Sequence, residues 1–164
     1  MSTGTRRTLW PLGIVAFALV VVAVPLVVAE PVRVTSDSMA PTLHAGDHVL
    51  VDKVSGSAHD PGRRDVIAFN IPGVSGLVIK RVVGVAGDTV GLDNGQLVVN
   101  GHRVREPFVD LPHLVGTYYG PVHVPKGTVF TMGDNRGNSI DSRRFGPVPL
   151  GHVLGRVLCV IWPA

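Results

Sequence analysis

Cysteine is almost absent from the chain, because Cys159 is the only one in 164 residues. A single cysteine excludes a disulfide within the chain and a cysteine-based zinc site. Cys159 lies in the apolar run 157–162, where a small buried side chain is the common role. We therefore expect it to be buried, and we do not expect it to be a nucleophile.

Charged residues are also scarce, at 16% of the chain, and only Arg6 and Arg7 lie among the first 29 residues. The remainder is nearly neutral, which argues against the basic surface of a nucleic-acid-binding protein. The seven histidines are scattered, with no spacing that resembles a zinc site. These observations predict no nucleic-acid partner and no metal.

One long apolar run is present, at residues 9–29. As a helix it would span about 30 Å, the hydrocarbon thickness of a bilayer. It exceeds the apolar core of about 7–15 residues found in cleavable signal peptides, so we expect an uncleaved transmembrane anchor. The small residues before Glu30 leave open a cut after Ala29, including self-cleavage.

The charges around this run predict its orientation. Arg6 and Arg7 precede it and Glu30 follows it, which places residues 1–8 in the cytoplasm and residues 30–164 outside. No second run of this length exists in the sequence. We expect a single-pass protein of the cell membrane, in contact with the lipid bilayer and with an extracytoplasmic domain.

The chain beyond the run is mainly β in pattern. Short β-branched runs alternate with Gly, Pro, Asn and Asp, and Asn94-Gly95 and Asn100-Gly101 are hairpin signals. Residues 102–125 contain several prolines and glycines and are expected to be irregular. The predicted strands are 49–51, 65–69, 77–83, 96–99, 127–131 and 153–158.

Ser36 and Ser38 stand just before Pro41. In an extended stretch, alternate side chains point to one face, so the two hydroxyls could converge. One could attack a carbonyl while the other donates to the oxygen that becomes negative, as acyl transfer requires. The alternative interpretation is a Ser/Thr-rich turn without chemistry.

A serine nucleophile needs a base, and Lys80 is the one residue that the pattern singles out. It lies in the middle of the apolar run 77–84, where burial would favour the neutral amine. A neutral amine can accept a proton from a serine. The alternatives are an edge-strand lysine that faces solvent, and a histidine base, although no one histidine is distinguished.

Residues 133–143 form a third polar stretch. Glycine falls at the fourth position from Asp134 and no glutamate closes the loop, which argues against an EF-hand. The spacings Asp134/Arg136 and Asp141/Arg143 suit ion pairs within a stiff loop. Ser139 could orient an amine there, or the loop could be a surface loop without chemistry.

Together, four blocks in this order behind one anchor resemble the bacterial type I signal peptidases, which are membrane-anchored Ser/Lys endopeptidases. The blocks are 36–43, 46–51, 80–88 and 133–143. Each block alone is a modest signal, but the ordered set covers most of the chain.

The resemblance implies a role for each matching position. Ser38 would be the nucleophile, Lys80 the general base, and Ser36 with the Ser38 backbone N–H the oxyanion hole, while Ser139 would orient the Lys80 amine. Structural support would come from Arg81, Asp134, Arg136, Asp141 and Arg143, with Asp134 reaching Arg81. Shallow substrate-binding pockets would be lined by Val34, Met39, Leu43, Val78 and Ile79.

The resemblance also implies a signal-peptidase-like coiled β-sheet catalytic domain over residues 30–164, with a reduced second β-subdomain at about 89–125. Its substrates would be preprotein signal peptides, cut after small residues at the outer membrane face, without a cofactor or an obligatory protein partner. Two alternatives stay open. A Ser/Lys self-cleaving regulator would carry an N-terminal DNA-binding module, and a non-enzymatic anchored β-domain would use Ser38 only in binding.

Overall fold

The computed structural model describes residues 29–54, 60–73, 76–109, 114 and 116–164. The expected cytoplasmic tail and residues 9–28 of the expected anchor lie outside these ranges, and Ala29 begins the first strand. Within the described residues, no helix is both long enough and apolar enough to cross a membrane.

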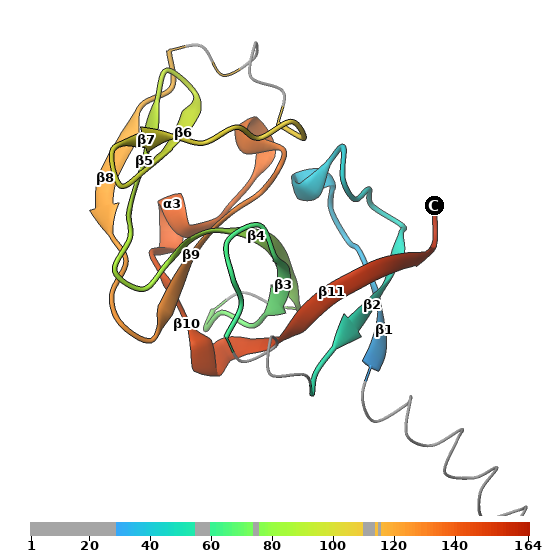
Figure 1. Ribbon diagram of the computed structural model, residues 1–164. Coiled ribbons are helices and arrows are strands. Elements are labelled where there is room, and N and C mark those ends of the chain that lie inside the picture. The colour runs from blue at the N-terminus through green and yellow to red at the C-terminus, as the bar shows by residue number, and fades with distance from the viewer. Residues whose placement is uncertain (1–28, 55–59, 74–75, 110–113, 115) are drawn as a thin grey trace, which may run out of the picture.

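Two antiparallel sheets make up the described part of the chain (Figure 1). The larger sheet has seven strands, and the long β11 joins the hairpin β1–β2 to the central strands β3, β4 and β9. In spatial order its strands are β1 (Ala29–Arg33), β2 (His48–Asp52), β11 (Val153–Trp162), β3 (Val66–Phe69), β4 (Val78–Val85), β9 (Thr128–Met132) and β10 (Val148–Pro149).

The smaller sheet lies on the side of the molecule away from β1 and β2 (Figure 1). The predicted hairpins are confirmed, because Asn94-Gly95 joins β5 to β6 and Asn100-Gly101 joins β6 to β7, all four residues with positive φ. The irregular structure expected over residues 102–125 is partly wrong, because β7 and β8 fall there. The strand order is β7 (His102–Arg103), β6 (Gln96–Val99), β5 (Thr89–Asp93) and β8 (Tyr119–His123).

Strand β4 is the centre of the fold. Six of its eight residues are buried, consistent with its near-continuous β-branched sequence and its position between β3 and β9. Ile79 packs with the core beneath β1 and β2, Val82 packs with Ile67 and Phe69, and Val83 packs with the smaller sheet. Lys80 and Arg81 are therefore carried on a rigid element.

Short helices lie in the connections and carry part of the predicted site, including Ser38, Arg136 and Arg143. The 3₁₀ helix η1 (Asp37–Met39) connects β1 to β2, and η3 (Arg136–Asn138) and α3 (Ser142–Phe145) connect β9 to β10. A further 3₁₀ turn, η4 (Leu150–His152), precedes β11. Because η1 packs against both β4 and η3, residues far apart in sequence meet at one place.

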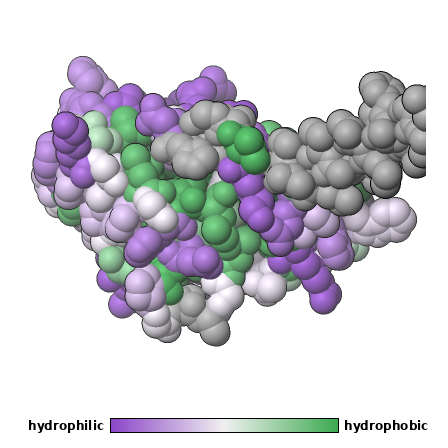
Figure 2. Space-filling view, turned by 90° about the horizontal axis from the view of Figure 1, so that it is seen from below, coloured by the Kyte–Doolittle hydropathy of each residue, from purple (hydrophilic) through white to green (hydrophobic). Residues whose placement is uncertain are grey.

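The end of β11 exposes apolar side chains. Cys159 is exposed there, so the expectation that it is buried is wrong, because the side chains of residues 158–162 are all exposed in this part of β11. Figure 2 shows apolar residues gathered at the surface of one face of the molecule, between hydrophilic margins. On β11 the large exposed apolar residues are Leu154, Leu158, Val160, Ile161 and Trp162.

Candidate active site

Ser38 lies in the 3₁₀ turn η1 and not in an extended stretch, which corrects the expected backbone around the serine pair. Ser36, at the N-terminal cap of this turn, is extended, with φ −149° and ψ 159°. The change of backbone direction still brings the hydroxyls together, and Ser36 Oγ donates a hydrogen bond to Ser38 Oγ at 3.2 Å. Ser38 is buried, while Ser36 is exposed.

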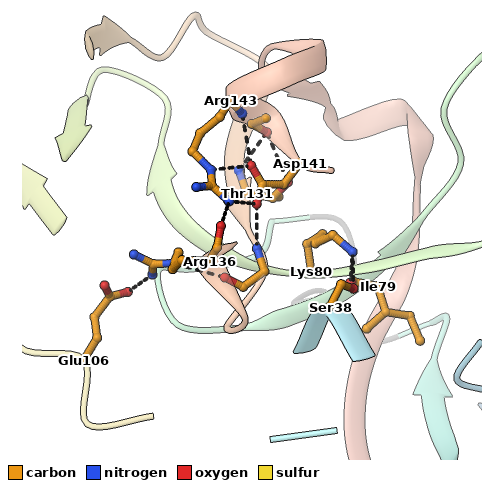
Figure 3. Close-up of polar contacts among 10 residues, drawn as sticks. Ser38, Ile79, Lys80, Glu106, Thr131, Arg136, Asp141 and Arg143 are labelled. Atoms are coloured by element: carbon orange, nitrogen blue, oxygen red, sulfur yellow. Dashed lines mark hydrogen bonds and ion pairs between the residues drawn. The ribbon is translucent and has the colours of Figure 1, made fainter. Parts of the chain in front are cut away.

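Lys80 reaches the same hydroxyl from β4. Its Nζ lies 2.7 Å from Ser38 Oγ and 3.0 Å from the Ile79 carbonyl oxygen, so the side chain is held at two points. Figure 3 shows the lysine side chain directed at Ser38. Only 5% of Lys80 and 8% of Ser38 is exposed, which leaves the pair almost free of bulk water.

Burial lowers the pKa of Lys80 from 10.5 to about 8, because the ammonium loses its hydration. The charges of Asp141 and Asp134 act in the opposite direction and favour the ammonium. Each of these carboxylates is paired with an arginine, Arg143 and Arg81 respectively, and this pairing limits their effect on the lysine. The result is an amine that is partly neutral near neutral pH.

The loop 133–143 packs against the turn that carries Ser38. Asn135 N–H donates to the Ser38 carbonyl at 3.1 Å, and Asn135 Nδ2 donates to the Asp37 carbonyl at 3.2 Å. Gly133 allows this approach, since a Cβ there would overlap the Ser38 carbonyl oxygen and the Ser139 hydroxyl. The glycine is therefore required by close packing and not by an unusual φ angle.

Three arginine–carboxylate pairs surround the site. Arg81 donates to both oxygens of Asp134, at 2.8 and 2.6 Å, and Arg143 pairs with Asp141 at 2.8 Å. The expected approach of Asp134 to Arg81 is confirmed, whereas the expected pair between Asp134 and Arg136 is wrong. Asp134 is occupied by Arg81, and Arg136 pairs with Glu106, a partner 30 residues away, at 2.5 Å.

Asp141 also holds the loop from within. It accepts a hydrogen bond from Gly133 N–H at 3.0 Å and caps α3 by accepting from Arg143 N–H at 3.2 Å. Burial would raise the pKa of this carboxyl, but the hydrogen bonds and charge of Arg143, together with the Gly133 N–H, hold the pKa below its ordinary value. Asp141 is thus ionised at neutral pH.

Ser139 does not form the expected hydrogen bond with Lys80. Its hydroxyl is buried beside Gly133 and forms no hydrogen bond with a described residue. The same hydroxyl lies near Asp141 and helps to lower the pKa of that carboxyl. The lysine amine is instead held by Ser38 and the Ile79 carbonyl.

A cavity of about 830 Å³ opens in front of the Ser38–Lys80 pair. Of the expected pocket residues, Val34, Met39, Val78 and Ile79 line it. Leu43 does not, because it is buried in the core beneath β1 and β2. Four further apolar residues line the cavity without a sequence signal that marks them, namely Ile71, Leu77, Ile140 and Phe145.

Two further polar residues of the site carried no recognisable sequence signal. Thr42 donates to Asp134 Oδ2 at 2.5 Å and connects the nucleophile turn to the Arg81 pair. Glu106 is one acid in a Pro-containing segment, and its partner is distant in sequence. Only the position of Thr42 inside the serine block could have marked it in advance.

The geometry can support serine-based acyl transfer, because a hydroxyl, an amine of lowered pKa and an open apolar cavity meet at one point. Within the described residues, no group of three or more His, Cys, Asp or Glu side chains is placed to hold a metal ion.

Comparison with known proteins identifies the family. The family model described as signal peptidase, peptidase S26, matches residues 7–162. The chain is 35% identical to a signal peptidase I of Leptolyngbya laminosa over 83% of this chain and 70% of that one. It is 39% identical to a probable signal peptidase I of Synechocystis, over 94% and 81%.

A solved structure agrees with this assignment. The crystal structure of a signal peptidase I from Enterococcus faecalis matches 60% of this chain and 97% of its own chain, at 33% identity and a TM-score of 0.54. The chain therefore belongs to the peptidase S26 family of serine-type signal peptidases, the enzymes that cleave signal peptides.

Proposed function

We propose that Ser38 and Lys80 form the catalytic pair of this signal peptidase. The observation that carries the proposal is the 2.7 Å contact between Lys80 Nζ and Ser38 Oγ in a buried site, with a lysine pKa of about 8. Histidine is absent from the described residues that line the cavity, which favours lysine as the base. Ser38 is also the hydroxyl to which Ser36 donates.

The reaction follows from these positions. Neutral Lys80 takes the proton of Ser38 as its oxygen attacks the carbonyl at the cut site, and the ammonium then protonates the leaving amine. Water activated by the regenerated amine hydrolyses the acyl-enzyme. The Ser36 hydroxyl and the Ser38 backbone N–H donate to the oxyanion, for which one donor is typically worth about 3–4 kcal/mol.

The remaining expected site residues have supporting roles in this proposal. Arg81 with Asp134, and Arg143 with Asp141, fix the strand and the loop on either side of the pair and limit the carboxylate charge felt by Lys80. Arg136 fixes the loop through the Gly133 carbonyl, to which it donates at 3.0 Å. Ser139 lines the same cavity as Lys80 and would orient its amine.

Small residues are expected at the first and third positions before the cut. Val34, Met39 and Ile79 are largely buried, so they present shallow apolar surfaces to the cavity and leave little depth for long side chains.

The full-length protein in lipid vesicles is incubated with a membrane-inserted preprotein, and the cut site is read by mass spectrometry. A matched preprotein with Leu at the third position is the control and should be cut poorly. Efficient cleavage after Phe or Lys would contradict these pockets.

We infer that the catalytic domain lies at the outer membrane surface. Trp162 is in register with His48, and His48 with Arg33, so the exposed apolar end of β11 lies at the same end of the sheet as the turn that carries Ser38. An apolar surface beside the site suits a substrate that is embedded in a bilayer. The charge asymmetry of Arg6 and Arg7 supports a cytoplasmic N-terminus.

This topology predicts a protease-protection pattern. Protease added outside intact spheroplasts should digest the domain of residues 30–164, while a tag placed before Arg6 should survive until detergent is added. The tag signal after detergent is the control for protease access. Protection of the large domain in intact spheroplasts would invert the orientation.

A further inference from the structure

The segment Glu106–Phe108 connects the smaller sheet to the catalytic residues, and the proposed mechanism does not use it. It follows β7 in a stretch that the sequence pattern left without a role. Two of its side chains contact arginines of the catalytic region. Glu106 contacts Arg136, and Phe108 contacts Arg81.

Glu106 holds the loop 133–143. The Glu106–Arg136 pair is almost fully buried, with 4% and 0% of the two side chains exposed, and Glu106 Oε1 lies 2.5 Å from Arg136 Nη2 (Figure 3). Arg136 Nε donates to the Gly133 carbonyl at 3.0 Å, and the Arg136 carbonyl accepts from Arg143 at 2.8 Å. Glu106 thus fixes an arginine that is bonded to both ends of the loop.

Phe108 holds the strand side of the site. The Arg81 guanidinium carbon lies 4.0 Å from the centre of the Phe108 ring, within the range of a cation–π contact. The same guanidinium makes the bidentate pair with Asp134, which in turn accepts from Thr42. Arg81 follows Lys80 directly in the chain. By packing on the Arg81 guanidinium, Phe108 restrains the residue next to the proposed base.

We propose that Glu106 and Phe108 are positioning residues. They keep the loop 133–143 and strand β4 in the relative position at which Lys80 meets Ser38. The smaller sheet thereby acts on catalysis through one short segment. The inference rests on the proposed catalytic pair. It assigns to Glu106 and Phe108 no contact with the reacting atoms.

The physical basis is the steep dependence of catalysis on geometry. A displacement of about 1 Å in a catalytic group can cost roughly 10²-fold in rate without changing which residues are present. Loss of either contact leaves Ser38 and Lys80 intact but frees an arginine that fixes one side of the site. The effect should therefore appear in kcat, while KM, which reflects the cavity lining, changes little.

Phe108 offers the sharper experiment, because a matched pair of variants distinguishes the effect of the aromatic ring from the effect of side-chain volume. Phe108→Leu removes the cation–π contact at similar volume, and Phe108→Tyr retains it. In preprotein cleavage by the full-length protein in lipid vesicles, Phe108→Leu is expected to lower kcat about tenfold with KM within about twofold. Phe108→Tyr should remain within about twofold of wild type in both constants. Tyr118→Leu, at a largely exposed aromatic side chain, is the matched control and should be unchanged.

Glu106→Gln is the second variant, because it keeps the shape and removes the charge opposite Arg136. Its kcat is expected to fall at least about tenfold, since a buried arginine is left without its counterion. Thermal melts establish that each variant is folded at the assay temperature. The two variants act on different arginines, so either one that folds is a sufficient test.

The outcomes separate this inference from the proposed function. Wild-type kcat in folded Phe108→Leu or Glu106→Gln overturns the positioning role of that residue. Equal losses in Phe108→Leu and Phe108→Tyr, with KM raised, also overturn it, because they indicate a packing effect on the cavity. Ser38→Ala is run in parallel. If that variant still cleaves, the proposed catalytic pair fails, whereas an inactive Ser38→Ala beside a fully active Phe108→Leu contradicts the positioning role alone.

Discussion

Ser38→Ala is expected to lose preprotein cleavage by on the order of 10⁴-fold or more, as removal of an attacking nucleophile does in other serine hydrolases. The substitution deletes one oxygen that accepts hydrogen bonds from Ser36 and Lys80. The substitution removes one oxygen and keeps the Cβ, so the melting temperature should change little. Steady-state cleavage and a thermal melt on the same preparation measure the two expectations.

Ser36→Ala is the matched control for this experiment. Ser36 is exposed, and its hydroxyl would act on the developing oxyanion, so its loss should cost about 10²–10³-fold in kcat with little change in KM. A Ser38→Ala protein that still cleaves would require another nucleophile. A Ser36→Ala protein that loses only substrate binding would remove Ser36 from the oxyanion hole.

Lys80→Met and Lys80→Arg are both expected to be inactive, with losses on the order of 10⁴-fold. Methionine has no basic atom, and a guanidinium does not give up its proton at the pH of the assay. In the wild type, kcat/KM should rise with pH through the lysine pKa of about 8. A flat profile between pH 6 and pH 9 would contradict Lys80 as the base.

The lowered pKa also predicts a pH-dependent stability difference. Between pH 8 and 10.5 the unfolded chain binds a proton at Lys80 that the folded chain does not, so stability falls as pH falls through this window. Below pH 8 the buried ammonium costs about 3 kcal/mol, which follows from the difference in pKa. Lys80→Met should therefore be at least as stable as wild type at pH 7, and its advantage should disappear above pH 10.5. Urea unfolding at both pH values measures this difference.

The strands that the sequence predicted correctly are those that contain β-branched runs and no proline. Strands β2, β3, β4, β6, β9 and β11 all overlap predicted runs. Strand β1 contains Pro31 and β8 contains Pro121, and both are edge strands, where proline is tolerated because one side of the ladder is unpaired. The β-branched pattern of strand β5 is interrupted by Gly91. A Cβ atom at this position would lie too close to the Tyr119 carbonyl oxygen. Local propensity does not reveal such strands, because tertiary pairing determines them.

The polar network shows the same limit. The sequence marked Lys80 because a charge within an apolar strand is conspicuous, and it marked Ser38 because of the neighbouring serine and proline. The two side chains do meet in the folded chain. The pairing of Arg136 was not, because nearness in sequence pointed to Asp134 while folding placed Glu106 beside it. The backbone of η1 was also missed, since a three-residue turn leaves almost no periodicity. Contacts between distant segments depend on the assembled sheets.

The most direct test of the Ser/Lys pair is a single cleavage assay on Lys80→Arg beside alanine variants of each of the seven histidines. All proteins are full length, in the same vesicles, at pH 8, with equal folded fractions by thermal melt. The pair predicts no detectable cleavage by Lys80→Arg and cleavage close to wild type by every histidine variant. Retained cleavage by Lys80→Arg, together with loss in one histidine variant, would contradict the pair and assign the base to that histidine.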